Sequence, residues 1–400
     1  MKNTIFNKVV LKFCLLGALD RFMLIYSVYI MFFAKIGLNP ATIGLILAFY
    51  EIGKILSDSV FAALADKHGR KNLICIGFLF KACGISLWVI FPGVISAFVG
   101  VFLIGIGKSG TNNIDSYMYD ELKANNYEKY FKSAIAMKSI VTNISASIGG
   151  YASSVLYTIG NFEAVFLAAI FVILFISIPY ILFFLKDSKL YITENQNKSI
   201  LYVAKNGFLV IKNNRKIFYS IILVAIFYSA YIMYTDTNKM IMNDIGFSPD
   251  LIAKIYSVAH IIPAITTTIF LIFRPGILIR GIVVLTMIIW ISIAVSAYIL
   301  YGKPLVAVIL VYLFMFPIFD SCIKDNLHRV INNSSVRATI LSFSSLLSSF
   351  INIISSILIG FIANKYSYQV SIVIFSILIS STVFIIMVVQ RFKVMKKIIS

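Results

Sequence analysis

Charged side chains interrupt the long apolar runs of this sequence, and they are the residues best able to carry chemistry. Asp20 lies in the first run, Glu51, Lys54 and Asp58 lie in the second, and Asp115 lies in the fourth. If the runs span a membrane, each charge costs roughly 2.5 to 3.5 kcal/mol and needs a partner, water or a function. A desolvated carboxylate can exchange a proton near neutral pH unless a nearby base keeps it ionised. We therefore predict Asp20, Glu51 and Asp115 as proton-coupling residues.

The spacing of Glu51, Lys54 and Asp58 places all three on one face of a helix. That face cannot point at lipid. Two interpretations remain open, an ion-pair ladder that fixes helix packing and a proton relay that is coupled to transport. The basic residues Arg21 and Lys108 lie near the predicted carriers in sequence and could hold them ionised.

Polar residues in other runs could contact a substrate. Tyr228, Tyr231 and Asn238 follow one stripe at helical spacing, and Asn112 and Asn113 are adjacent amides in the fourth run. A Tyr and Asn lining suits a substrate of mixed polarity. The alternative is ordinary hydrogen bonding between helices. The predicted cavity residues are Arg21, Lys108, Asn112, Asn113, Tyr228, Tyr231 and Asn238.

The composition defines the class of protein that must position these residues. Of the 400 residues 60% are apolar and 13% are charged, where a soluble chain has roughly a quarter charged. This excludes a soluble enzyme, a nucleic-acid-binding domain and a secreted disulfide scaffold. The four cysteines have no paired or metal-ligand spacing, and no P-loop is present. We expect no enzyme activity, no metal, no cofactor and no direct use of ATP.

The apolar runs predict an all-α membrane protein with twelve transmembrane helices. Alternating strand-like segments of a membrane β-barrel are missing from the pattern. The predicted helices are 9–33, 41–64, 72–91, 95–118, 133–158, 163–185, 217–241, 250–273, 277–300, 304–323, 338–363 and 368–390.

Lys and Arg in the loops predict the orientation of these helices. With the N-terminus in the cytoplasm, 23 basic residues fall in inner segments, whereas the outer loops hold only Lys35, Lys303 and Lys365. Both termini are therefore expected in the cytoplasm. This topology also explains the formal charge of +19 without nucleic acid.

The longest polar stretch divides the chain into halves. We predict an N-terminal six-helix bundle at 1–186, a cytoplasmic linker at 187–216 and a C-terminal six-helix bundle at 217–400. A shift of 205 residues aligns DSYMYDEL (115–122) with DSCIKDNL (320–327), which favours a duplicated origin for the two halves. Parallel repeats with substrate between them are a known transporter plan.

Three motifs resemble those of a known family. The loop ALADKHGRK (63–71) resembles the G-x-x-x-D-x-x-G-R-K signature of the major facilitator superfamily, with Ala62 in place of the first glycine. YDELK (119–123) and RATILSFSSL (337–346) resemble a bacterial exporter branch of that superfamily. The resemblance implies the twelve-helix fold of two bundles and secondary active transport. It also implies a gating role for Asp66 and Arg70 in closing the cytoplasmic side.

The chemistry of this loop also favours a gate. Gly69 permits a tight turn, and Arg70 can bind a carboxylate in a bidentate manner, with Lys71 beside it. The simpler alternative is that these bases only fix the topology. We expect structural or gating pairs from further charges where helices leave the membrane, namely Asp120, Lys132, Asp325 and Arg337.

Together these features predict a secondary transporter that works by alternating access in a bacterial cytoplasmic membrane. The favoured function is proton-coupled export of a small amphipathic compound such as a drug, a metabolite or a short peptide. The alternatives are an ion-coupled importer of a nutrient or peptide, and a non-transporting accessory or immunity protein. The expected partners are a small-molecule substrate, protons or another coupling ion, and the lipid bilayer. The protein is expected to be monomeric and to bind no nucleic acid.

Overall fold

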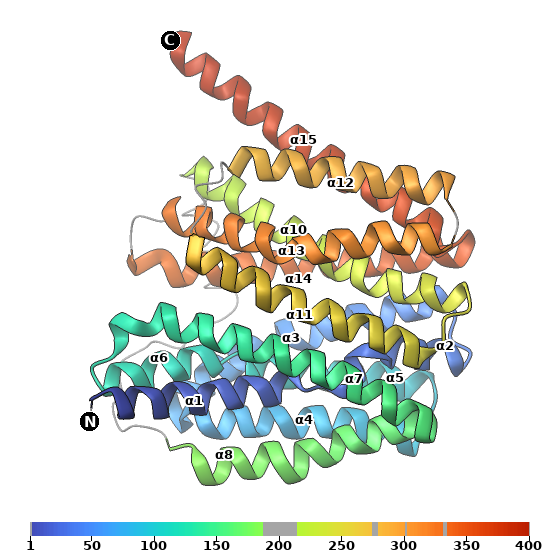
Figure 1. Cartoon of the computed structure of the whole chain (residues 1–400). Helices are drawn as coiled ribbons and strands as arrows, with labels where there is room; N and C mark the ends of the chain where they lie inside the picture. Colours follow the sequence, from blue (N-terminus) through green and yellow to red (C-terminus); the bar gives the residue numbers. More distant parts are fainter. Residues whose placement is uncertain (1, 187–213, 274–278, 301, 331–333, 400) are drawn as a thin grey trace. The chain divides into compact units, whose positions relative to one another are not determined.

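The computed structural model describes residues 2–186, 214–273, 279–300, 302–330 and 334–399, and within them all regular structure is helical (Figure 1). Eight segments are long and apolar enough to cross a membrane. Helices suit this environment because they satisfy every backbone polar group internally. One of the eight, Ser133–Phe184, covers two predicted helices. The all-α membrane fold is confirmed, and the segments are consistent with the predicted count of twelve.

The chain divides into two compact units, which we describe separately. The first unit comprises Met1–Ile200 and Gly246–Arg274, and the second comprises Leu201–Ile245 and Pro275–Ser400. Most of the predicted linker, at 187–213, lies outside the described residues.

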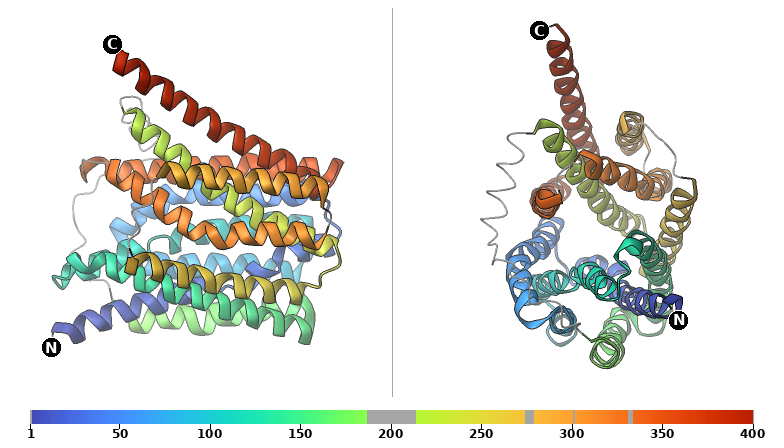
Figure 2. Two further views of the ribbon diagram at one scale, coloured as in Figure 1. Left: turned by 45° about the horizontal axis from the view of Figure 1, so that its top comes forward. Right: turned by 90° about the vertical axis from the view of Figure 1, so that its left-hand side faces the viewer.

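The first unit is built around α5 and α7. Its elements are α1 (Lys2–Arg21), η1 (Leu24–Ser27), α2 (Tyr29–Lys35), α3 (Pro40–His68), α4 (Arg70–Ile90), α5 (Val94–Thr111), α6 (Ile114–Ala124), η2 (Glu128–Tyr130), α7 (Phe131–Phe171), η3 (Val172–Ser177), α8 (Ile178–Phe184) and α11 (Pro249–Phe273). α5 packs against α3 and α4, and α7 packs against α1 and α11. α11 belongs to this unit because it runs along α7, as Figure 2 also shows.

The second unit contains the remaining described helices. They are α10 (Arg215–Asp244), α12 (Ile279–Ile299), α13 (Lys303–Val330), α14 (Ser334–Lys365) and α15 (Tyr368–Ile399). α10 packs against α13 and α14, and α12 packs against α15 and α13. α10 therefore has neighbours on more than one side, and much of its length is buried.

Two predicted continuous helices, 9–33 and 95–118, are broken, which corrects the sequence-based prediction. The first is interrupted between α1 and α2 by the short 3₁₀ turn η1, and the second is interrupted at Asn112 and Asn113 between α5 and α6. The backbone around η1 is buried, with Leu24 and Ile25 nearly inaccessible. Non-helical backbone is tolerated at membrane depth where protein surrounds it.

Small residues bring the backbone of α5 against its two neighbours. A Cβ atom on Gly105 would overlap the carbonyl oxygen of Tyr50 on α3, and one on Gly107 would overlap that of Gly77 on α4. Glycine at such positions allows membrane helices to approach closely and gain packing contacts. α5 therefore fixes the separation of α3 and α4.

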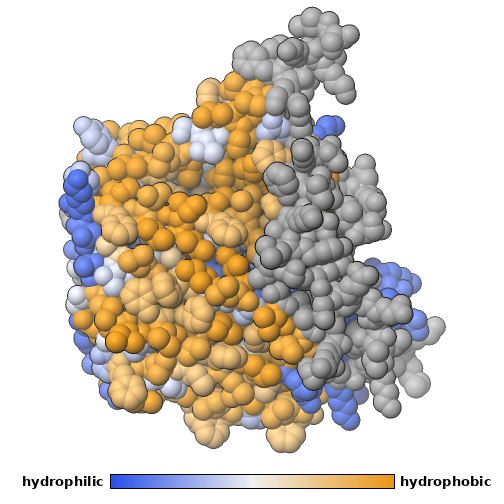
Figure 3. Space-filling view, turned by 180° about the vertical axis from the view of Figure 1, so that it is seen from behind, coloured by the Kyte–Doolittle hydropathy of each residue, from blue (hydrophilic) through white to orange (hydrophobic). Residues whose placement is uncertain are grey.

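A broad apolar surface covers much of the face seen in Figure 3, with hydrophilic residues gathered toward its edges. Large apolar side chains are strongly exposed on the described helices, including Ile95, Ile159 and Phe183 at about three quarters of their area each. Soluble proteins rarely expose contiguous apolar patches of this extent. The surface is consistent with contact to lipid.

Candidate functional site

Asp20, near the C-terminal end of α1, is the centre of a buried ion cluster in the first unit. Its side chain is 8% exposed, and it lies 2.5 Å from Lys81 Nζ of α4 and 2.9 Å from Lys108 Nζ of α5. Each lysine donates to a different carboxylate oxygen. Burial of this acid is tolerated because both oxygens are engaged by opposite charges.

The two lysines differ in their surroundings. Lys81 is completely buried and also donates to Thr111 Oγ1 at 3.1 Å, at the end of α5. The side chain of Lys108 is 27% exposed. Lys81 therefore provides a fixed counter-charge, whereas Lys108 has room to leave Asp20. Lys81 lies within the predicted helix 72–91, but only the tertiary structure identifies Asp20 of α1 as its partner.

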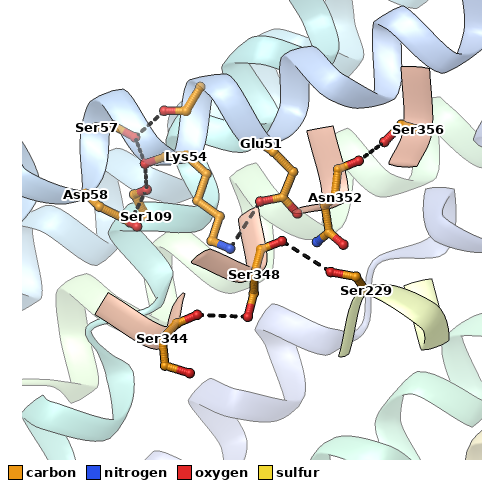
Figure 4. A network of polar contacts seen from close by, with 11 residues as sticks. Glu51, Lys54, Ser57, Asp58, Ser109, Ser229, Ser344, Ser348, Asn352 and Ser356 are labelled. Atoms are coloured by element: carbon orange, nitrogen blue, oxygen red, sulfur yellow. Dashed lines mark hydrogen bonds and ion pairs between the residues drawn. The ribbon is translucent and has the colours of Figure 1, made fainter. Parts of the chain in front are cut away.

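A second set of charges lies along α3 (Figure 4). Lys54 Nζ is 3.3 Å from Glu51 Oε2, and both side chains are buried. One helical turn further along, Asp58 accepts a hydrogen bond from Ser109 of α5 at 2.5 Å. Asp58 therefore packs against α5, and the burial of Glu51 and Lys54 shows that the predicted shared face points away from lipid.

Asp115 and Arg21 occupy more open positions. The Asp115 side chain is 52% exposed at the start of α6, and it forms an ion pair with Lys138 of α7. Arg21, next to Asp20 in sequence, is exposed. The structure therefore brings Asp20 together with Lys108, whereas Asp115 pairs with Lys138 instead.

The predicted gating loop forms a network at the start of α4. Gly69 has a φ of 83°, a left-handed conformation that glycine adopts at little cost. Arg70 Nε lies 2.7 Å from Asp120 Oδ2 of α6, and its Nη1 lies 3.4 Å from Asn113 Oδ1. Lys71 donates to the carbonyl oxygen of Leu182 in α8 at 2.8 Å. The loop thereby ties α4 to α6 and α8.

Of the other predicted site residues, only some have side chains that the structure describes. Asn112 is exposed in the α5–α6 turn, while Asn113 donates back to the Ser109 and Gly110 carbonyl oxygens. The backbone of Asp66 lies in α3. Some predicted side chains lie outside the described residues, namely those of Asp66, Lys132, Asp325 and Arg337.

In the second unit, the tyrosine stripe of α10 packs against α13. The ring of Tyr231 stacks on Phe316 with centroids 4.1 Å apart and planes at 14°. Tyr228 and Tyr231 are partly exposed, whereas Asn238 is completely buried. The stripe therefore offers two accessible aromatic rings and one interior amide.

This arrangement supports exchange of ion pairs and protons more than bond-breaking chemistry. No cluster of three or more His, Cys, Asp or Glu side chains suited to a metal occurs in the part of the chain that the structure describes. The Asp20 cluster joins α1, α4 and α5, so a change in its ion pairs changes the contacts between these three helices.

The comparisons with known proteins agree with this architecture. The model of the Major Facilitator Superfamily matches residues 13–348, most of the chain. The chain belongs to the major facilitator superfamily. Members of this superfamily are membrane transporters of small molecules and are not enzymes, so a multi-pass membrane location and a small-molecule substrate follow. No curated protein matches the sequence.

Solved transporter structures have the same fold as this superfamily member. A mutant form of the nucleoside transporter NupG is 17% identical with a TM-score of 0.74, covering 94% of this chain and 99% of that one. A bacterial homologue of the human lysosomal transporter Spinster, inward-facing and unoccupied, is 15% identical with a TM-score of 0.68, covering 96% of each. The POT family transporter PepTSo is 13% identical with a TM-score of 0.69, covering 97% and 98%. At these identities the similarity shows the fold alone.

Proposed function

We propose that this protein is a proton-coupled secondary transporter that exports a small amphipathic compound by alternating access. The observation that carries the proposal is the buried carboxylate of Asp20 held between Lys81 and Lys108. Buried ionisable residues in membrane proteins commonly mark ion pathways and proton relays. An ion pair that joins three helices can respond to a proton by loosening, which would move those helices relative to one another.

The coupling role rests on Asp20 first and on Glu51 second. Asp20 joins α1, α4 and α5, whereas Glu51 pairs within its own helix with Lys54. Asp115 stays a candidate, although its exposure and its pairing with Lys138 leave it a more conventional surface ion pair. Solved structures with this fold include one described as bearing on proton-dependent oligopeptide transporters.

The gate is proposed at the start of α4. Arg70 joins Asp120 and Asn113, and this contact ties α4 to α6 just beyond the break in the fourth predicted helix. Opening of the cytoplasmic side would break it. Asp66, Gly69 and Lys71 complete the loop motif that resembles the superfamily's gate, and Lys132, Asp325 and Arg337 are proposed as further pairs at helix ends.

The amphipathic character of the substrate is supported by the chemistry of each unit. The first unit offers the partly exposed ammonium group of Lys108 and the exposed Arg21, and the second offers the rings of Tyr228 and Tyr231. Charged groups and aromatic faces together suit a compound with a polar end and an apolar body. Protons and the substrate are the proposed partners, and a bacterial cytoplasmic membrane with inner termini is the proposed location.

The function is tested by untargeted mass spectrometry of cells and medium. Cells with the native protein are compared with cells that carry Asp20→Asn or the control Glu128→Gln, at equal membrane abundance. Glu128 is exposed in η2 and far in sequence from the cluster. A compound depleted inside and enriched outside with the native protein and with the control, but not with Asp20→Asn, supports proton-coupled export.

Other results identify the alternatives. The reverse distribution identifies an importer, and no difference over several growth conditions favours a non-transporting accessory protein. Once a compound is known, its transport is driven by a pH gradient in proteoliposomes. If Asp20→Asn and Glu51→Gln both retain full gradient-driven transport, the assignment of coupling to these carboxylates is wrong.

A further inference from the structure

Asp58 differs from the other acidic residues of the first unit's interior. Asp20 pairs with two lysines and Glu51 pairs with Lys54, all within the 4.0 Å ion-pair limit. Among the residues that the structure describes, no basic nitrogen lies that close to Asp58, and its hydrogen bond comes from the Ser109 hydroxyl. A carboxyl partnered by a hydroxyl is stable in either protonation state, because a hydroxyl can donate or accept.

We propose that Asp58 is the proton-binding carboxyl of the first unit and that Ser109 is the hydroxyl that accommodates its two protonation states. This inference deepens the proposed proton coupling and rests on it for its role in transport. It places the proton on α3, whereas Asp20 lies on α1.

The contacts of Ser109 carry the argument. Its Oγ lies 2.5 Å from Asp58 Oδ1 and 2.9 Å from the carbonyl oxygen of Lys54 (Figure 4). A hydroxyl has one proton and can donate to only one of these two acceptors at a time. With Asp58 protonated, Asp58 donates to Ser109 and Ser109 donates to Lys54, so both short contacts become hydrogen bonds. With Asp58 ionised, Ser109 rotates its proton toward the carboxylate and no heavy atom has to move.

The charges that act on Asp58 come from both helices of this interface. Glu51 and Lys54 lie on α3 itself, and Lys108 reaches it electrostatically from α5. Lys81 of α4 is engaged by Asp20. The charge on Asp58 therefore acts on Lys54 of its own helix and also on Lys108, the base that pairs with Asp20.

The protonation state of Asp58 can thereby control the Asp20 cluster. Ionised Asp58 competes with Asp20 for the ammonium group of Lys108, whereas protonated Asp58 leaves Lys108 to Asp20. Lys108 is the partly exposed base of the cluster, so it is the one with room to move. In this step a hydronium ion gives its proton to a carboxylate oxygen of Asp58: one O–H bond of the hydronium breaks, one O–H bond forms on Asp58, and a water molecule is left.

Infrared spectroscopy of the purified full-length protein tests the assignment without a known substrate. The probe is pH, titrated in light and heavy water, and the signal is the C=O stretching band of a protonated carboxyl. We expect a band that grows as the pH falls through neutrality and that is lost in Asp58→Asn. The same band should persist in the control Glu128→Gln.

A further variant pair tests the role of Ser109. Ser109→Ala removes the hydrogen bond to the protonated carboxyl and should move the band to higher frequency, whereas Ser109→Thr keeps the hydroxyl and should leave it in place. A purely structural role for Ser109 predicts no change of frequency in either variant, and that result overturns the assignment of Ser109.

Different results would overturn the assignment of Asp58 and the proposed function. The assignment of Asp58 is overturned if the native protein has no carboxyl band near neutral pH. It is also overturned if that band is unchanged in Asp58→Asn. If the band behaves as expected but a pH gradient drives no transport by the native protein, the proton site stands and the proposed function is wrong.

Discussion

At the scale of single residues, the position of Asp20 depends on two lysines that are 61 and 88 residues away in sequence. Both lysines donate to it at short distance, and Lys81 is completely buried. Removing one member of a buried ion group leaves the others as uncompensated charges, which costs more than the pair itself contributes. The cluster therefore has to be treated as a unit in any mutational study.

This leads to a prediction about stability. Asp20→Asn leaves Lys81 without its counter-charge and should destabilise the protein by about 3 to 5 kcal/mol. The double variant Asp20→Asn/Lys81→Met removes the stranded charge and should recover a large part of the loss. Thermal unfolding in detergent, with Glu128→Gln as the control, measures both effects. Equal melting temperatures for the single and double variants would contradict a stabilising pair at this position.

At the scale of helices, α1 and α5 each end at a break in a predicted helix, and α5 also makes the close glycine contacts. α1 ends one residue after Asp20, and α5 ends at Thr111, which binds Lys81. Both interrupted helices therefore carry members of the buried cluster near their ends. The turns that follow give these helices a place to bend, whereas α5 itself is held firmly by α3 and α4.

The close contact of α3 and α5 gives a testable prediction. Gly105→Ala places a methyl group against the carbonyl oxygen of Tyr50, so the two helices must separate. Overpacking of this kind typically costs about 1 to 3 kcal/mol. The matched control is Gly281→Ala in α12, where the added Cβ meets no atom within 4 Å. In size-exclusion profiles after heating, the peak of the folded protein should disappear at a lower temperature for Gly105→Ala than for Gly281→Ala. Identical profiles would show that this interface relaxes freely.

At the scale of the whole molecule, the distribution of charge predicts the membrane topology. The described surface is apolar enough for lipid, and basic residues are concentrated in alternate loops. Such an asymmetry of Lys and Arg sets the orientation of helices in bacterial membranes. It predicts that the loop after α6 lies in the cytoplasm and that the loop between α14 and α15 lies outside.

Cysteine labelling in intact cells tests this topology. In a cysteine-free background, Lys365→Cys should react with a membrane-impermeant thiol reagent, whereas Lys129→Cys should react only after the cells are opened. Both positions are exposed in the structure, so burial does not explain a difference between them. Labelling of Lys129→Cys in sealed cells, with Lys365→Cys protected, would reverse the predicted orientation.

Runs of about 20 apolar residues are enough to predict a membrane protein, because they leave few alternatives to membrane helices. The loop motif at 63–71 was likewise local, and its resemblance to the superfamily agrees with the family to which the chain belongs. The acidic residues at membrane depth could also be predicted from the sequence, because a charge within an apolar run is easily recognised. What such local signals could not supply was the partner of each charge.

The partners of these charged residues follow from the tertiary structure. Lys81 and Lys108 meet at Asp20, Ser109 meets Asp58, and Asp115 turns out to be exposed, because ion pairs between helices depend on how the helices pack and rotate. The breaks after Arg21 and Thr111 were also not predicted, because apolar residues resume directly beyond the polar residues Arg21, Asn112 and Asn113 and each apolar run is long enough for one helix. The composition of a segment determines whether it enters the membrane. The packing of the helices determines that Asp20 forms ion pairs whereas Asp58 is hydrogen-bonded to a hydroxyl.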